Sequence, residues 1–480
     1  MGAAAVTGAG AVVLLVGDDI DPAGGADSAL SIQQRIDEAP DGAVIAIPPG
    51  AVLRCTRTLT LSGTGKTLLG PGELRFTDGD FEMVALRVTG DRCRVHLVSI
   101  TNPDEGFGRA LEIAADDVTV EGCVVDRFLY GIVVAASGEW VDTRIIGNRV
   151  INVLGAGGGR GSDSRDGEDG GDGITVWGAR ATVTGNVVSA LPGTDARIGI
   201  HAEGLPDSAG EDRPHSGAMV TITGNVVSGP FRRCIVLEEI DHGAVVGNTV
   251  ADATWWCLAV IGGRGCLVTG NTVRYTRTAD DDQGRSYSPA RSAVLVYAGE
   301  GHTVSGNTVA VLGAADAFVT LYTLLGSRPT DVLVADNNCR TQGDGTCDFG
   351  VTVAGEPGAV RPRIRGNSLV GVRSAGVYLG QATTPEVSGN LVDGAPGCER
   401  GVFGDSPAND GALLVGNRVS GCTTGIGLFG QTAAVVSGNL VSDCGAALDL
   451  FGSTGVVVTG NVFPRAGVPI QNAGENRVLP

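Results

Sequence analysis

A six-residue pattern, apolar-x-Gly-Asn-x-apolar, recurs along the chain from residue 145 to residue 463. It appears as IIGNRV, VTGNVV, ITGNVV, VVGNTV and close variants, and one copy, VADNNC, has aspartate in place of the glycine. The asparagines of the pattern are Asn148, Asn186, Asn225, Asn248, Asn271, Asn307, Asn337, Asn367, Asn390, Asn417, Asn439 and Asn461. Several intervals between them are 22 or 23 residues and the rest are longer. The chain therefore repeats a unit near 22 residues that carries insertions.

Each unit contains two short segments in which apolar and polar residues alternate, such as residues 173–177 and 181–184. This alternation, rich in β-branched residues, predicts strands, and nothing between them is long or periodic enough for a helix. Strands that recur at this period without helices must wind in one direction. The predicted fold class is all-β: a single-stranded right-handed parallel β-helix, a solenoid of about fifteen rungs, with a short N-terminal capping helix.

The asparagines and glycines of the pattern have a structural role in such a coil. Each asparagine would stack on the one a rung below, with its amide bonding along the axis, and the glycine would supply a turn with positive φ. Leucine-rich repeats require LxxLxL before the asparagine, and propeller blades need about 40 residues, so neither fold fits the repeat.

Composition excludes several other classes of protein. Glycine makes up 77 of the 480 residues, but there are only 20 prolines, which excludes collagen, and 42% hydrophobic content excludes a disordered chain. The net charge of -19 argues against binding to nucleic acid or anionic membranes. No apolar run approaches the roughly 20 residues that span a bilayer. The eleven cysteines form no CxxC pair, so we expect buried thiols rather than a zinc site or a disulfide scaffold.

Residues 28–39, SALSIQQRIDEA, place apolar side chains at Leu30, Ile32 and Ile36 and predict a short amphipathic helix. This helix would cover the open end of the coil. Together with the following PDGAVIAIPPG and the Gly-Asn repeats, it resembles the pectate-lyase superfamily, which includes many phage tailspikes. The resemblance covers nearly the whole chain and implies the β-helix fold. The vWiDH and RxPxxR signatures of pectate lyases, and the NTD, DD and GHG set of polygalacturonases, are not found, so the resemblance concerns fold rather than chemistry.

The expected domain organisation is one coil with short ends. Residues 1–42 would form the N-terminal segment and capping helix, residues 43–470 the β-helix, and residues 471–480 a tail. The long intervals place insertions at residues 154–172, 204–217, 275–291 and 323–329. These loops would wall one outward strand face into a groove, and long loops on a repeat scaffold are usually functional.

The candidate catalytic residues lie on that outward face. Side chains alternate across a strand, so the residues beside inward Ile200 and Ile235 point outward, and they include His201, Glu203 and Glu238. The two glutamates hold equivalent places on adjacent rungs, about 4.8 Å apart. Like charges at that distance raise one pKa, which would provide a protonated acid beside an ionised partner.

Other side chains complete the expected site. Asp241 or Asp212 is an alternative partner for Glu203, and His201 is a candidate base, proton shuttle or sugar ligand. Candidate substrate-binding side chains are aromatic rings that could stack on sugars and arginines that could hold an acidic sugar: Trp177, Trp255, Trp256, Tyr297, Tyr322, Arg285 and Arg291.

A carboxylate-rich loop is the one candidate for a metal. Asp163, Asp166 and Asp169 could bind Ca²⁺, but they lack the ordered spacing of a calcium loop, which favours a solvated segment. We therefore expect no cofactor, and Ca²⁺ is the one candidate ion.

These observations favour a glycan-depolymerising enzyme, foremost a glycoside hydrolase with paired carboxylates. One alternative is a phage tailspike or surface attachment protein that binds, and also cleaves, a host glycan. Another is a polysaccharide lyase or epimerase, disfavoured because Lys66 is the only lysine. The expected partner is a polysaccharide or oligosaccharide, with no nucleic acid and no membrane insertion. The resemblance implies a homotrimer and an extracellular or virion-associated location, and residues 1–16 lack the basic region of a secretory signal.

Overall fold

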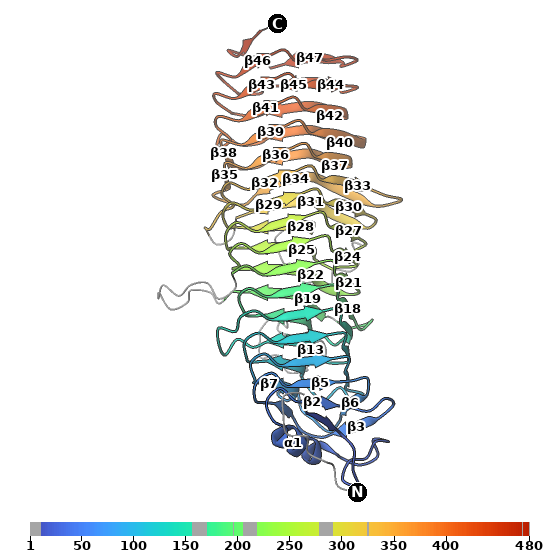
Figure 1. Ribbon diagram of the computed structural model, residues 1–480. Coiled ribbons are helices and arrows are strands. Elements are labelled where there is room, and N and C mark those ends of the chain that lie inside the picture. Colours follow the sequence, from blue (N-terminus) through green and yellow to red (C-terminus); the bar gives the residue numbers. More distant parts are fainter. Residues whose placement is uncertain are drawn as a thin grey trace. The chain divides into compact units, whose positions relative to one another are not determined.

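The computed structural model describes residues 11–155, 170–194, 196–204, 218–277, 291–323, 326–472 and 474–479. The chain divides into two compact units, Met1–Ala244 and Val245–Pro480. In both, short strands follow one another around a coil and pair in parallel with the strands one turn away (Figure 1). Among the described residues the single helix is α1 (Ala29–Glu38), and it is too short to cross a membrane.

The first unit contains three parallel ladders. The ladder that carries the candidate site, here called the site ladder, pairs strands of similar register in chain order: β7 (Val84–Val88), β10 (Arg109–Ile113), β13 (Tyr130–Val134), β16 (Asp172–Val176), β19 (Ala196–Glu203) and β22 (Phe231–Glu238). The second ladder pairs β3 (Val52–Cys55), β6 (Glu73–Phe76), β9 (Ser99–Thr101), β12 (Val124–Asp126), β15 (Arg149–Val153), β18 (Val187–Ala190) and β21 (Val226–Ser228). The third pairs β1 (Val12–Leu14), β2 (Val44–Ala46), β5 (Thr67–Leu69), β8 (Arg94–His96), β11 (Thr119–Glu121), β14 (Arg144–Ile146), β17 (Thr182–Thr184) and β20 (Thr221–Thr223). β4 (Leu59–Leu61) pairs with β7, and β23 spans Ala244–Val246.

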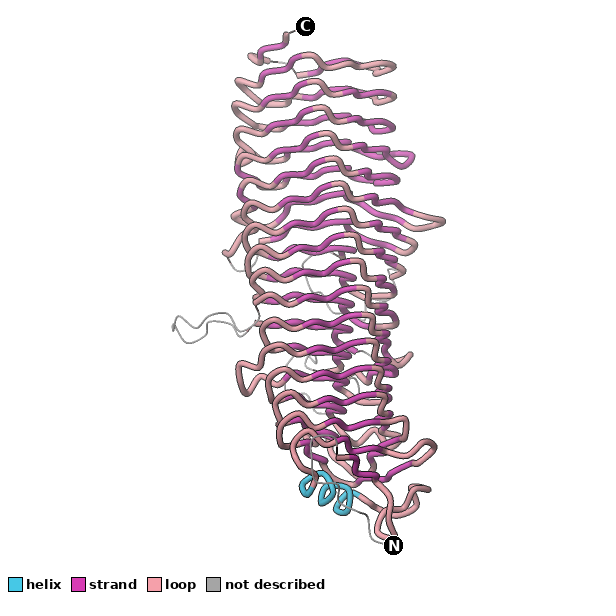
Figure 2. The backbone as a smooth tube through the Cα atoms, in the orientation of Figure 1, coloured by secondary structure: helices cyan, strands magenta, loops and turns pink. Residues whose placement is uncertain are grey.

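The second unit repeats this arrangement. One ladder follows β25 (Trp256–Ile261), β28 (Ser292–Tyr297), β31 (Ala314–Tyr322), β34 (Thr346–Ala354), β37 (Ser368–Leu379), β40 (Leu391–Gly404), β42 (Arg418–Leu428), β45 (Ala446–Asp449) and β47 (Val468–Gln471). Another follows β24 (Thr249–Ala251), β27 (Thr272–Tyr275), β30 (Thr308–Val311) and β33 (Asn338–Thr341), continues through β37, β40 and β42, and ends at β44 (Leu440–Ser442). The third follows β26 (Leu267–Thr269), β29 (Thr303–Ser305), β32 (Leu333–Ala335), β36 (Arg363–Arg365), β39 (Glu386–Ser388), β41 (Leu413–Val415), β43 (Val435–Ser437), β46 (Val457–Thr459) and β48 (Arg477–Val478). β35 (Ala359–Val360) and β38 (Ala382–Thr383) form a separate short pair. In the described parts of the backbone trace, loops connect the strands, except between β1 and β2, where α1 intervenes (Figure 2).

The predicted N-terminal helix is confirmed, with one correction to its apolar face. Ile32 and Ile36 of α1 are buried, but Leu30 is 64% exposed. Leu30 lies two residues before Ile32, on the opposite side of a helix with 3.6 residues per turn, so the helix cannot bury both. All eleven cysteines are buried and free, as expected.

The asparagine ladder is confirmed as a continuous hydrogen-bonded column within each unit. In the first unit, Asn186 Oδ1 accepts hydrogen bonds from the backbone nitrogen and Nδ2 of Asn148, at 2.8 and 3.0 Å. Its own Nδ2 donates to Asn225 Oδ1 and to the carbonyl of Ile145, both at 2.9 Å. Gly185, just before it, has φ of 66°, the left-handed turn that glycine accepts without steric cost.

Replacing Asn186 by alanine should lower the free energy of unfolding by about 3 kcal/mol. The substitution leaves several buried donors and acceptors without partners, and each unpaired group costs about 1–3 kcal/mol. Chemical denaturation measures the loss. Asn338→Ala is the matched control, because its side chain is exposed and a change within about 0.5 kcal/mol is expected. Equal losses in the two variants would contradict a stabilising ladder.

Candidate functional site

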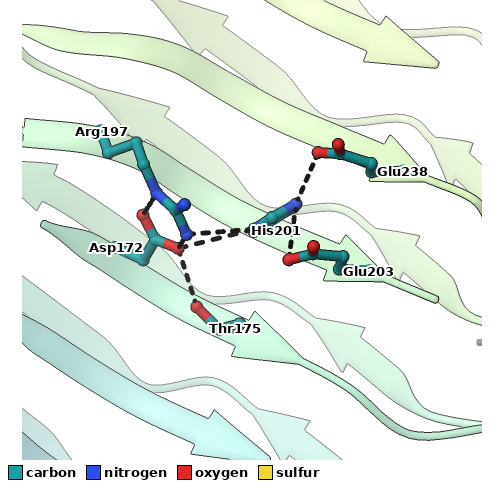
Figure 3. Close-up of polar contacts among 6 residues, drawn as sticks. All are labelled: Asp172, Thr175, Arg197, His201, Glu203 and Glu238. Atoms are coloured by element: carbon teal, nitrogen blue, oxygen red, sulfur yellow. Dashed lines mark hydrogen bonds and ion pairs between the residues drawn. The ribbon is translucent and has the colours of Figure 1, made fainter. Parts of the chain in front are cut away.

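Two columns of side chains on the site ladder bring the candidate residues together. Parallel pairing sets Thr175 opposite His201, and Glu203 opposite Glu238. Because His201 and Glu203 are two residues apart on one strand, they point to the same face. Figure 3 shows the resulting cluster, with His201 between the carboxylates of Glu203 and Glu238 on one side and Asp172 and Arg197 on the other.

An ion pair between Asp172 and Arg197 lies on the Nδ1 side of His201. The side chain of Asp172 is 0% exposed, and its carboxylate accepts hydrogen bonds from Arg197 Nε at 2.9 Å and from an Arg197 terminal nitrogen at 2.5 Å. Thr175 Oγ1 donates to the same carboxylate at 3.0 Å. Burial alone would raise the pKa of Asp172, but the charge and hydrogen bonds of Arg197 outweigh it and lower the pKa. Asp172 is therefore an ionised group fixed in the protein interior.

His201 connects this ion pair to the two glutamates. Its Nδ1 lies 3.6 Å from Asp172 Oδ2, and its Nε2 lies 3.5 Å from Glu203 Oε2 and 3.3 Å from Glu238 Oε2. Burial would lower the pKa of His201, but its contacts with Asp172 and Glu238 outweigh burial and raise the pKa. The sequence predicted that His201 faces outward from its strand. The structure shows that this side chain is buried among three carboxylates.

The pKa values of the two glutamates are shifted in opposite directions. Burial, strengthened by the charge of Glu238, raises the pKa of Glu203 to about 7. Burial also acts to raise the pKa of Glu238, but its hydrogen bond to His201 and the positive charges of His201, Arg233 and Arg197 lower it overall. Near neutral pH the pair therefore combines a carboxylic acid that can hold its proton with an ionised carboxylate. Such a divergence is typical of acid–base and nucleophile pairs.

The same three side chains are also close enough to share a cation. One ligand atom each from His201, Glu203 and Glu238 lies within 4.8 Å of the others. A divalent ion bound there would replace the proton on Glu203, so metal binding and acid catalysis by Glu203 are alternatives. The predicted calcium-loop residues Asp163, Asp166 and Asp169 lie outside the described residues.

The other predicted site residues fall in different places. Trp177 lies beside the cluster, with its ring centroid 6.5 Å from that of His201. Asp241 lies in the turn after β22, so the pair built on adjacent strands is Glu203 and Glu238. Asp212 and Arg285 lie outside the described residues.

The remaining candidates belong to the second unit. Trp255 and Trp256 have ring centroids 6.0 Å apart, and Trp256 begins β25. Tyr297 and Tyr322 end paired strands, with centroids 5.5 Å apart. Arg291 lies just before β28. Substrate contacts by these residues remain predictions.

Sequence reasoning missed the two residues that orient His201. The insertion predicted at residues 154–172 includes Asp172, but this residue begins β16 and is buried. Arg197 was not singled out at all. Their positions in the sequence could have indicated this contact. Asp172 lies two residues before Ile174 and Arg197 three residues before Ile200, and these two inward isoleucines pair on adjacent rungs.

Comparisons with known proteins agree on the fold. Residues 292–477 match the family described as right handed beta helix region. The structure is similar to the A-module of the mannuronan C-5 epimerase AlgE6 from Azotobacter vinelandii, with a TM-score of 0.56 and 16% identity over 78% of this chain and 97% of that chain. The chain is a right-handed parallel β-helix. No curated protein matches its sequence.

Two further solved structures are similar to this β-helix. One is a tailspike of E. coli bacteriophage HK620 in complex with a pentasaccharide, with a TM-score of 0.46 and 12% identity over 92% of this chain and 76% of that chain. The other is the DFA-IIIase of Arthrobacter chlorophenolicus A6 in complex with DFA-III, with a TM-score of 0.40 and 13% identity over 72% of this chain and 70% of that chain.

Proposed function

We propose that this β-helix cleaves a glycan by hydrolysis with retention of configuration, with Glu203 as the general acid and base and Glu238 as the nucleophile. The observation that carries the proposal is the pair itself: two carboxyl groups with oxygens within 4.8 Å of each other and pKa values moved in opposite directions. Retaining glycosidases hold their carboxyl groups about 5–5.5 Å apart, whereas inverting enzymes need about 6.5–9.5 Å to admit water between them.

Each residue has a defined task in this reaction. Glu203 gives its proton to the glycosidic oxygen as Glu238 attacks the anomeric carbon, so the leaving sugar departs as an alcohol and a glycosyl ester forms. Glu203, now ionised, then removes a proton from water, which attacks the ester and releases Glu238. His201 keeps Glu238 ionised through their 3.3 Å contact, and the ion pair of Asp172 and Arg197 holds the imidazole in place.

A glycan-panel digestion with mass analysis of the products tests this function. We expect shortened oligosaccharides that each contain one added water. Unsaturated products that absorb ultraviolet light would indicate elimination instead of hydrolysis. A polymer of unchanged length whose sugars have altered stereochemistry would indicate epimerisation. Binding of a glycan without any cleavage product would indicate an attachment protein. A protein acting on polymeric glycans would work outside the cell or on a virion.

The pH dependence of kcat/KM should follow the two glutamates. Glu203 must be protonated for the first step, so activity should fall as pH rises through about 7. Glu238 must be ionised, so activity should fall in acid only below the ordinary pKa of glutamate. Initial rates at low substrate concentration from pH 3 to 9 measure both limbs. An alkaline limb that persists in Glu203→Gln with an aryl glycoside, whose leaving group needs no proton, would contradict the assignment of Glu203.

A further inference from the structure

A cleft of about 720 Å³ adjoins the carboxyl cluster on the site ladder. Its walls come from β7, β10, β13 and β16, and it reaches Arg197 on β19. Thr175 and Arg197 belong both to the cleft and to the network beneath His201. A glycan chain lying across the strands, with its scissile bond at the glutamates, would continue over this cleft. The cleft therefore has the position of a subsite.

The cleft is positively charged within an acidic protein. Three arginines line it, Arg87, Arg109 and Arg197, while Glu112 is the one carboxylate among its lining residues. Arg197 is matched by the buried Asp172. Arg87 and Arg109 share the single charge of Glu112, at 2.7 and 3.3 Å. Among the described residues that line the cleft, one positive charge is thus left without a carboxylate partner, although the chain carries a net charge of -19.

The two arginines are presented to a ligand rather than folded into the interior. Their side chains are 43% and 39% exposed, whereas that of Glu112 is 13% exposed, so the carboxylate forms the floor and the guanidinium groups stand above it. The guanidinium carbon of Arg109 lies 5.9 Å from the ring centroid of Tyr130. Trp177 lines the cleft beside the cluster. Aromatic side chains next to guanidinium forks suit a ring with an apolar face and an anionic substituent.

We propose that this cleft binds the anionic substituent, a carboxylate or a sulfate, of a sugar next to the cleaved bond, so that the substrate is an acidic glycan. The identification of this sugar as part of a substrate rests on the proposed function, but its binding does not. Arg87 and Arg109 hold the anion, and Arg197 marks the boundary with the catalytic cluster. A neutral glycan would gain nothing from the uncompensated charge.

Affinity electrophoresis of the full-length protein through gels that contain dextran, carboxymethyl dextran or dextran sulfate tests the inference. The three polymers share one backbone and differ in charge. We expect retardation by one or both charged polymers, weakened by added salt, and none by dextran. Retardation by carboxymethyl dextran alone assigns a carboxylate, and by dextran sulfate alone a sulfate. Equal retardation by dextran, or none by either charged polymer, would overturn the inference.

Variants locate the binding within the cleft. Arg109→Ala should weaken binding of the charged polymer about tenfold, because charge-assisted hydrogen bonds are lost, and Arg109→Lys should weaken it less. Arg144→Ala is the control. Arg144 lies on β14, in another ladder of the same unit, its side chain is 49% exposed, and it forms an ion pair with Asp117. Circular dichroism of each variant verifies folding. Equal losses in Arg109→Ala and Arg144→Ala would also overturn the inference. Cleavage of a neutral glycan would refute the anionic cleft but not the hydrolase, whereas binding without cleavage would refute only the hydrolase.

Discussion

Replacing Glu203 by glutamine will lower hydrolysis of the natural glycan by about 10²- to 10⁴-fold, because glutamine has no proton to give to the leaving oxygen. Replacing Glu238 by glutamine will lower it at least as much, since no nucleophile remains for the anomeric carbon. The amide is nearly the same size as the carboxylic acid, so both variants should fold normally. Steady-state rates on the glycan found in the panel digestion measure the two losses.

A second substrate separates the two roles. An aryl glycoside with a good leaving group needs no acid, so Glu203→Gln should retain much of its first-step rate on this substrate and Glu238→Gln should not. Glu121→Gln is the control, because Glu121 is an exposed glutamate of the same unit on another ladder. Full activity of both glutamate variants on the natural glycan would exclude this pair from catalysis.

The second large effect concerns stability. Arg197→Leu will lower the free energy of unfolding by about 3–5 kcal/mol, because it leaves the carboxylate of Asp172 buried without its main ionic partner. Adding Asp172→Asn should recover part of the loss by removing the buried charge. Denaturant titrations of the single and double variants measure both changes. Arg180→Leu is the control, since Arg180 and Asp142 form an exposed pair and its loss should change stability much less.

The stability loss will depend on pH in a defined direction. In the wild-type protein the pKa of Asp172 is lowered, so its ionised form stabilises the fold above the unfolded pKa, and this contribution is lost as pH falls through the folded pKa. In Arg197→Leu, burial acts without its main opposing charge and raises the pKa, so a proton can neutralise Asp172. The deficit should therefore be largest near neutral pH and shrink toward pH 4. A deficit that is independent of pH would contradict this origin.

Much of the fold is predictable from local pattern alone. Alternation and the Gly-Asn spacing act within a few residues, so they identify strands, turns and the stacked asparagines directly. The copy VADNNC shows that glycine is not obligatory, because Asp336 adopts φ of 54° in its place, and aspartate tolerates this conformation. The same local reasoning placed Glu203 opposite Glu238, since both follow inward residues on adjacent rungs.

What local pattern could not predict depends on contacts between turns. Asp172 and Arg197 are 25 residues apart and meet only because their strands pair, after an insertion whose length hides the register. The sequence suggested that one glutamate of the pair would have a raised pKa, but not which one. That choice comes from His201, whose Nε2 lies nearer to Glu238 and lowers its pKa, while the pKa of Glu203 stays raised. The arginine cleft was missed because Arg87 and Arg109 come from strands before the first clear repeat.

The measurement that most directly tests the central claim is mass spectrometry of products formed in water enriched in heavy oxygen. Hydrolysis through Glu203 and Glu238 predicts that every newly formed reducing end carries one heavy oxygen atom, in wild type and not in Glu238→Gln. Products that lack the label and contain an unsaturated sugar, or labelled products formed equally well by Glu238→Gln, would contradict the account.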